Sequence, residues 1–152
     1  MDIFHQSTFT DINREDTKLR TCELFKCEIG REQYLQLVKH TGDRNSLTRL
    51  RLSSHSLMIE RGRHLGILKD LRFCPFCPEH IEDEIHFLIK CKCYNAVRKT
   101  FFESEIKSKL PKNFSRKSEK QKFIILMTDM RMISHTAKLI RKLFSIRELI
   151  VF

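Results

Sequence analysis

Glycine and proline are scarce in this sequence, with 4 Gly and 3 Pro among 152 residues. These are the residues that most often interrupt regular structure, so their scarcity leaves room for long helical segments. The sequence also lacks any stretch of strand length that alternates apolar and polar residues, which is the pattern of a half-buried β-strand. We therefore expect a mainly α-helical fold.

Two further absences concern membranes and secretion. No run approaches the roughly 18 apolar residues that a transmembrane helix requires. The first sixteen residues, MDIFHQSTFTDINRED, carry acids and polar groups where a signal peptide has a basic start and an apolar stretch. We expect a soluble intracellular protein, located in the nucleus or the cytoplasm and without a membrane partner.

The length suits one domain, and 41% hydrophobic residues can build a modest core. We expect a frayed or disordered N-terminus over residues 1–16 and a single helical domain over residues 17–152. Gly30 is expected to end the first helix, Gly42 to break the chain after the second, and Asp43 or Asn45 to cap the third. Helices are predicted over residues 17–30, 31–40, 45–63, 82–110, 120–130 and 132–149, with a basic linker at 110–120.

Two of these predicted helices carry informative details. Serines at positions 53, 54 and 56 weaken the middle of the third helix, so a bend is expected there. In the last helix one apolar stripe recurs at helical spacing and is expected to face the core: Ile133, Ala137, Ile140 and Phe144.

The charge balance is strongly basic. Lys and Arg total 29 against 19 Asp and Glu, which gives a formal net charge of +10. Such an excess favours contact with nucleic acid or with an anionic membrane surface, although it says nothing about the fold.

Four of the six cysteines fall within residues 74–93, together with two histidines. In a reducing compartment such a cluster indicates metal binding rather than a disulfide framework. The spacing is Cys74-x2-Cys77-x8-His86-x4-Cys91. A tight turn can present the first two thiolates, and a helix ending at the second ligand can present the His and the last Cys. Thiolate and imidazole ligands suit zinc, and four protein ligands leave no coordination position open, which is typical of a structural Zn²⁺ site. A zinc knuckle with one Zn²⁺ is therefore predicted over residues 72–94.

Two neighbouring residues offer alternative ligands. His86 is preferred to His80, because His80 would crowd three ligands into one turn. The choice between Cys91 and Cys93 stays open on spacing alone.

Several phrases resemble the region that follows the reverse transcriptase domain in non-LTR (LINE-like) retrotransposon polyproteins. They are LTRLRLSSHSLMIERGR (47–63), RFCPFCP (72–78), IEDEIHFLIKC (81–91) and Tyr94-Asn95 with Arg98. The flanks KLRTCELFKCEIGREQYL, EKQKFIILMT and AKLIRKLFSIRE resemble it too, so the resemblance extends from about Lys18 to Glu148.

The resemblance implies a zinc knuckle whose ligands map onto Cys74, Cys77, His86 and Cys91, with Cys93 as an unexplained extra thiol. It also implies a module that handles nucleic acid, RNA or DNA, beside a reverse transcriptase domain. No aromatic-x-Asp-Asp motif and no endonuclease constellation occurs, so we expect no enzyme and no small-molecule substrate, and the chain looks like a detached C-terminal fragment.

Three other readings compete with a nucleic-acid-binding module. Zinc could organise helices that dock on a polymerase or another protein, or the chain could be a non-functional retroelement fragment. A metal hydrolase would need an open zinc position, which a four-ligand set denies.

The candidate nucleic-acid contacts lie around the knuckle. Phe73 and Phe76 bracket Cys74 and can either stack on unpaired bases or pack on the helix that carries His86. The full set of candidate contacts is Arg49, Arg51, Arg61, Arg63, Arg72, Phe73, Phe76, Lys90, Lys92, Arg98 and Lys99.

Overall fold

Helices form the regular structure of this protein, which a computed structural model describes for residues 19–25 and 30–151. Within these residues the only extended pairing is an isolated antiparallel bridge between Phe73 and Ile81. The mainly α-helical expectation is confirmed. The predicted frayed N-terminus, residues 1–16, lies outside the described residues, as does Cys27. The α-helices are α2 (Tyr34–Leu37), α3 (Thr41–Arg51), α4 (Met58–His64), α5 (Asn95–Thr100), α6 (Glu119–Thr128) and α7 (Ile133–Val151).

Short 3-10 and π-helical turns, labelled η, connect these helices. Two of them are π-helical, η3 and η5, and the others are 3-10 turns. Their bounds are η1 (Cys22–Leu24), η2 (Lys69–Leu71), η3 (His86–Lys90), η4 (Lys92–Tyr94), η5 (Phe101–Glu105), η6 (Lys107–Lys109) and η7 (Phe114–Arg116).

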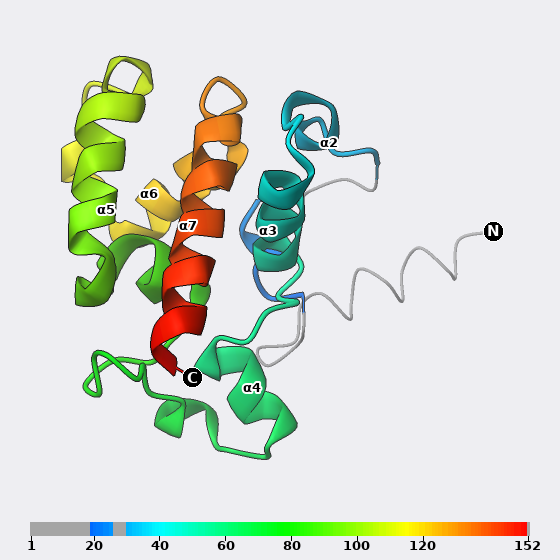
Figure 1. The fold of residues 1–152 in the computed structure, drawn as a ribbon, viewed down its shortest axis with the longest axis vertical. Helices are drawn as coiled ribbons and strands as arrows, with labels where there is room; N and C mark the ends of the chain where they lie inside the picture. The colour runs from blue at the N-terminus through cyan, green and yellow to red at the C-terminus, as the bar shows by residue number, and fades with distance from the viewer. Residues whose placement is uncertain (1–18, 26–29, 152) are drawn as a thin grey trace.

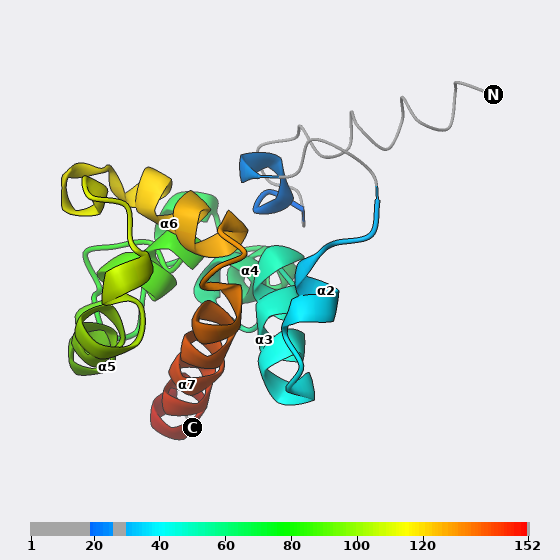
Figure 2. The same cartoon turned by 90° about the horizontal axis from the view of Figure 1, so that it is seen from above.

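The helices α3 and α7 lie side by side and run in the same direction (Figures 1 and 2). At one end Ser134 donates a hydrogen bond to the carbonyl oxygen of Leu37. At the other end the guanidinium of Arg49 lies over the Phe144 ring, 5.2 Å from its centroid. This pair of helices forms the centre of the scaffold.

The inner face of α7 follows the predicted stripe. Ile133, Ala137, Ile140 and Phe144 are all buried. Side chains at this spacing lie on one face of a helix, so burying them fixes the rotation of α7 against α3. This prediction is confirmed.

The break between α3 and α4 is sharper than the predicted bend. The helix ends at Arg51, and Ser53 has a positive φ of 50°. Its hydroxyl lies 2.8 Å from that of Thr21 and donates to Glu84 at 2.9 Å, which stabilises the turn. The predicted helix over residues 45–63 is therefore two helices.

The start of α3 also differs from the prediction. The helix begins at Thr41, so Gly42 lies in its first turn and does not break the chain. His40 is the N-cap, because its Nδ1 accepts a hydrogen bond from the Asp43 backbone N–H at 3.2 Å. Neither Asp43 nor Asn45 caps the helix, because both lie inside it, and the Asp43 carboxylate binds Arg141.

The first two predicted helices are short in the structure. Between Thr17 and Gly30 the described part is a single 3-10 turn, η1. The second helix is limited to the one turn of α2, because Val38 takes an extended conformation and is buried against the core. By contrast, α6 and α7 agree closely with their predicted bounds.

No helix among the described residues combines the length and the apolar character that crossing a bilayer requires.

Candidate metal centre

The segment from Arg72 to Glu82 folds back on itself as a short hairpin. The Glu82 N–H donates to the Arg72 carbonyl at 3.0 Å, and the Cys74 N–H donates to the His80 carbonyl at 2.8 Å. The Cys77 N–H in turn donates to the Cys74 carbonyl at 3.3 Å, which closes the turn that contains Pro75. Cys74 and Cys77 consequently extend their thiols toward the same space.

The other half of the centre comes from the π-helical turn η3. The Cys91 N–H donates to the His86 carbonyl, five residues earlier, at 2.7 Å. In an α-helix, residues five apart lie on different faces, whereas a turn widened by an i→i+5 bond brings them onto one face. The carboxylate of Asp83 accepts the His86 backbone N–H at 2.7 Å and fixes the start of this segment.

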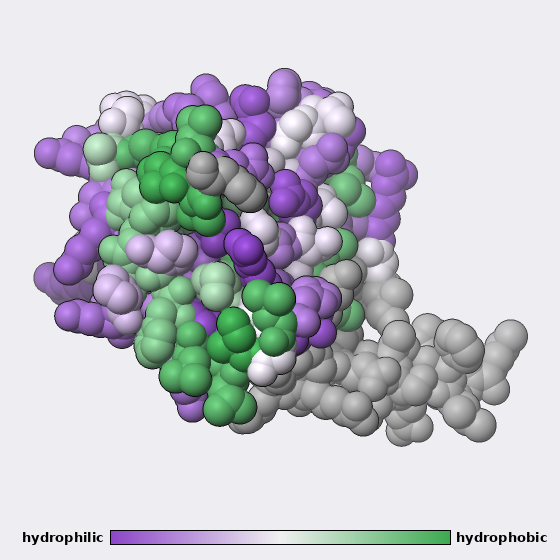
Figure 3. Space-filling model, turned by 60° about the horizontal axis from the view of Figure 1, so that its bottom comes forward, coloured by the Kyte–Doolittle hydropathy of each residue, from purple (hydrophilic) through white to green (hydrophobic). Residues whose placement is uncertain are grey.

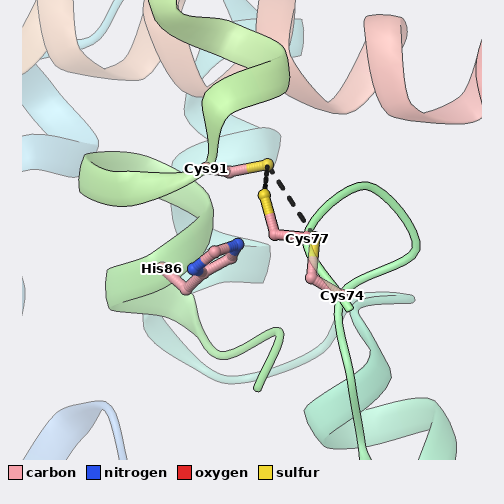
Figure 4. Close-up of side chains that lie close together, drawn as sticks. All are labelled: Cys74, Cys77, His86 and Cys91. Carbon is pink, nitrogen blue, oxygen red and sulfur yellow. Dashed lines mark hydrogen bonds between the residues drawn. The ribbon is translucent and has the colours of Figure 1, made fainter. Parts of the chain in front are cut away.

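These two segments bring four predicted ligands together (Figure 4). The sulfur of Cys91 lies 3.8 Å from that of Cys74 and 3.8 Å from that of Cys77. One ligand atom from each of Cys74, Cys77, His86 and Cys91 lies within 4.8 Å of the others. All four residues are buried, with exposed fractions of 2%, 6%, 3% and 1%.

The sulfur separations fit a shared metal ion and exclude a disulfide. A disulfide needs two sulfurs ~2.05 Å apart. Thiolates that share a tetrahedral zinc ion, each ~2.3 Å from it, stand ~3.8 Å from one another. The 3.8 Å separations of Cys91 from Cys74 and Cys77 match that tetrahedral edge.

His86 fits a metal ion for a separate reason. Its two ring nitrogens are buried, and neither has a hydrogen-bond partner among the described residues. A buried nitrogen without a partner costs free energy, which coordination would offset. In Figure 4 one ring nitrogen faces the three sulfurs, where it can serve as the fourth ligand.

The electrostatics of the centre favour thiolate at Cys74. The hydrogen bond from Cys91 lowers the pKa of the Cys74 thiol to about 4 against the opposing effect of burial, and the His86 imidazole and the backbone N–H groups of Phe76 and Cys77 add to this lowering. The same hydrogen bond raises the pKa of Cys91, which keeps its proton while Cys74 is ionised. A divalent metal ion displaces thiol protons when it binds, and the amides directed at sulfur stabilise the resulting charge.

The two alternative ligands stand outside the cluster. His80 is exposed, with its ring centroid 5.4 Å from that of His86. Cys93 is exposed as well. Within the described part of the chain, the group able to hold a metal contains His86 and Cys91 and neither alternative.

No family model, curated protein or solved structure matches this chain. The metal centre thus stands on its own geometry, and the resemblance to LINE-like polyproteins remains a prediction from the sequence phrases.

Arg98 is a buried support of the closing ligand, which corrects its assignment as a nucleic-acid contact. Its guanidinium donates to the carbonyl oxygen of Cys91 and to Asn95 Oδ1, the latter at 2.6 Å. Burial lowers the pKa of this guanidinium. Because its donors face inward and are engaged, Arg98 holds Cys91 in place and does not offer a surface charge.

Two other predicted contacts are also corrected by burial. Arg51 donates to the Met127 carbonyl at 2.6 Å and to Glu32 at 2.9 Å. Arg72 donates to the carbonyls of Ile59 and Ile67 at 3.0 and 2.9 Å. Both guanidinium groups are buried and donate to backbone carbonyl oxygens, so neither is accessible to a phosphate.

Three of the remaining candidates are half-buried and already have partners. Arg49 donates to the Ser54 carbonyl at 3.2 Å, and Arg63 is paired with Glu60 at 2.9 Å. Phe76 packs edge-on against Tyr94, with centroids 6.1 Å apart, which agrees with its packing alternative. The exposed candidates are Arg61, Phe73, Lys90, Lys92 and Lys99.

Sequence reasoning missed the role of two buried acids beside the metal ligands. Glu82 is bound by Arg147 of α7 through contacts of 2.7 and 2.9 Å, and also accepts the Met58 N–H at 2.6 Å. Glu84 accepts from Arg20 at 2.6 Å and lies 2.9 Å from His55 Nε2. In the sequence these acids stand at the start of the helix predicted over residues 82–110, and no local signal identifies partners so distant in the chain.

Burial alone would raise the pKa of Glu84. The hydrogen bond and charge of His55 together with the charge of Arg20 outweigh burial and lower this pKa to about 2. The carboxylate therefore stays ionised inside the protein and joins the segment between the candidate metal ligands to the helical scaffold.

Proposed function

We propose that this chain is a structural-zinc module that binds nucleic acid, of the kind that follows the reverse transcriptase domain in LINE-like polyproteins. The observation that supports it most is the buried group of three cysteines and one histidine with tetrahedral sulfur spacing. Three sulfur ligands and one nitrogen ligand in a closed tetrahedral set favour zinc over the other common biological metals.

The proposed role of the metal is structural. Four protein ligands would leave no position for water or substrate, and an open position is what catalytic zinc requires. Burial of all four ligands supports the same role. We accordingly propose that the module has no enzymatic activity of its own.

The proposal of nucleic-acid binding rests on charge and on the sequence phrases. The chain carries a formal net charge of +10, and exposed lysines at positions 90, 92 and 99 flank the closing ligand. The phosphate backbone supplies most of the affinity in such complexes, so a surplus of exposed cations is the property to expect.

The experiment has two parts. Mass spectrometry with inductively coupled plasma should find one zinc per chain in protein purified without chelator. Electrophoretic shifts with single-stranded RNA, single-stranded DNA and duplex, over a salt series, should show binding that weakens linearly in log K against log salt. A metal-loaded protein that shifts none of the three at low salt would contradict the nucleic-acid proposal.

A second candidate function, docking onto a reverse transcriptase domain, is favoured by one observation. Hydrophobic side chains gather on the end of the molecule that carries α4 and the C-terminal end of α7 (Figure 3). The exposed large hydrophobic residues there are Leu65, Leu68, Leu71, Phe73, Leu149 and Ile150. Co-purification with a LINE-like reverse transcriptase domain, lost in Leu68→Asp but retained in Leu35→Asp on α2, would support this candidate.

A further inference from the structure

Positive charge is concentrated in one segment away from most of the predicted contacts. Between residues 107 and 122 one acid, Glu119, stands against seven cations. We call this segment the basic loop; its cations are Lys107, Lys109, Lys112, Arg116, Lys117, Lys120 and Lys122.

Apolar residues anchor the basic loop to the core. Ile106 and Phe114 are buried, and the Phe114 ring lies 5.7 Å from that of Phe102. The end of the loop is fixed by the capping box at the start of α6, where Ser118 and Gln121 exchange hydrogen bonds. Because its apolar side chains point inward, the loop presents its cations on a defined surface.

The cations of the basic loop are also largely unpaired. Among the described residues no carboxylate forms an ion pair with Lys112, Arg116 or Lys120, and all three are exposed. By contrast, Arg51 and Arg63 in the predicted set are paired with Glu32 and Glu60. Unpaired exposed cations gain most from a polyanion, since binding breaks no existing ion pair.

The basic loop adjoins the metal centre through α6. Lys90 of η3 pairs with Glu119 at 3.2 Å. A shallow groove of about 300 Å³ lies between these elements, lined by basic and imidazole groups together with two acids. Its titratable lining residues are His80, Asp83, His86, Lys90, Glu119 and Lys120.

We propose that the basic loop, together with Lys90, is the surface on which the phosphate backbone of a nucleic acid docks. This inference rests on the proposed nucleic-acid function and moves its main contact from the arginines of residues 49–72 to residues 107–122. An anionic membrane is the less favoured occupant, because basic surfaces that bind membranes also expose apolar side chains. None of the exposed large hydrophobic residues in the described chain lies between positions 74 and 148.

The test compares two variants of equal net charge. In the loop variant, Lys112→Gln, Arg116→Gln and Lys120→Gln remove three exposed cations from the basic loop. In the control variant, Arg31→Gln, Lys39→Gln and Lys138→Gln remove three exposed cations from other surfaces. Circular dichroism and zinc content verify that both variants fold.

Binding is measured by fluorescence anisotropy with an oligouridylate, a matched single-stranded DNA and a duplex, over a potassium chloride series. Loss of three single-strand phosphate contacts should reduce the salt slope by about 2 and weaken binding about 100-fold near 0.1 M salt. The control variant should keep the wild-type slope. Vesicles of phosphatidylcholine with phosphatidylserine serve as the membrane arm.

The outcomes separate the two proposals. If wild-type protein binds none of the nucleic acids at low salt, the proposed function fails and this inference fails with it. If wild type binds and both variants weaken equally, the charge acts diffusely, and only the assignment to the basic loop is overturned. A loop variant that keeps nucleic-acid binding and loses vesicle binding likewise overturns the assignment in favour of a membrane.

Discussion

Cys91 and Cys93 provide a matched pair for testing the metal centre. They lie two residues apart in the same segment, yet Cys91 is buried beside two other thiols and Cys93 is exposed. Cys91→Ser should abolish stoichiometric zinc binding, because it replaces a soft thiolate with a hydroxyl at a tetrahedral corner. Cys93→Ser should leave the zinc content at one ion per chain.

The expected drop in melting temperature is large because the metal centre packs directly against the hydrophobic core. Phe87, in the π-helical turn between His86 and Cys91, is fully buried and stacks on Phe144 of α7 with centroids 4.8 Å apart. Structural zinc contributes of order 10 kcal/mol of apparent free energy to folding, which is comparable to the ~5–15 kcal/mol total stability of a domain. With a shift of about 2–4 °C per kcal/mol for a chain of this size, loss of the metal should lower the melting temperature by roughly 20–40 °C.

The assay is thermal unfolding followed by circular dichroism, run beside metal analysis on the same samples. Wild type treated with a chelator and Cys91→Ser should melt alike and far below untreated wild type. Cys93→Ser should melt within a few degrees of wild type, because an exposed thiol is removed. Zinc loss in Cys93→Ser with zinc retained in Cys91→Ser would refute the ligand assignment.

Three further predictions concern the surroundings of the centre. Arg98→Met should weaken zinc affinity about 10–100-fold in a competition titration with a chelating dye, because it frees the Cys91 carbonyl; unchanged affinity would mean that this support is dispensable. Glu84→Gln should lower the free energy of unfolding by about 3–5 kcal/mol in urea, since it removes a buried carboxylate bound by Arg20, Ser53 and His55. The pKa of Glu84 is lowered from 4.5 to about 2, so this difference should be constant from neutral pH down to 4.5 and shrink as the pH falls further toward 2; a difference that grows on acidification would contradict the assignment. Gly62→Ala should cost about 1–3 kcal/mol by thermal unfolding, because an added Cβ would lie 2.6 Å from Arg72 Cγ, and Gly66→Ser, where nothing lies within 4 Å of the added Cβ, tests strain from a positive φ alone.

Much of the fold could be predicted because helical periodicity is a local property. The stripe on α7 and the bounds of α6 and α7 depend on residues three and four apart, which the sequence displays directly. The helix starts were less predictable. His40 caps α3, and the carboxylate of Asp43 binds Arg141, a residue 98 positions away. A contact over that distance in the chain is not visible in a local pattern.

For the candidate site, too, the local features could be predicted from the sequence and the others could not. The ligand spacing is local, and the structure brings the four expected residues together. What spacing could not provide was the π-helical turn that places His86 and Cys91, five apart, on one side. Residue type alone predicted the nucleic-acid contacts. In the structure the guanidinium groups of Arg51, Arg72 and Arg98 donate to backbone carbonyl oxygens inside the protein. The charge of a residue does not reveal whether its side chain faces solvent or binds backbone carbonyl oxygens in the interior.

The buried acids connect the candidate metal centre to the helices. Glu82 lies between the two halves of the ligand set, and its carboxylate is held by Arg147 near the end of α7. Arg147 is itself buried, and its charge is matched only by that carboxylate among the ion pairs of the described residues. Removing either partner would leave an isolated charge in the interior, whereas the intact pair is tolerated. The last helix therefore positions the segment between the two pairs of candidate metal ligands, through a contact that the ligand spacing itself does not specify.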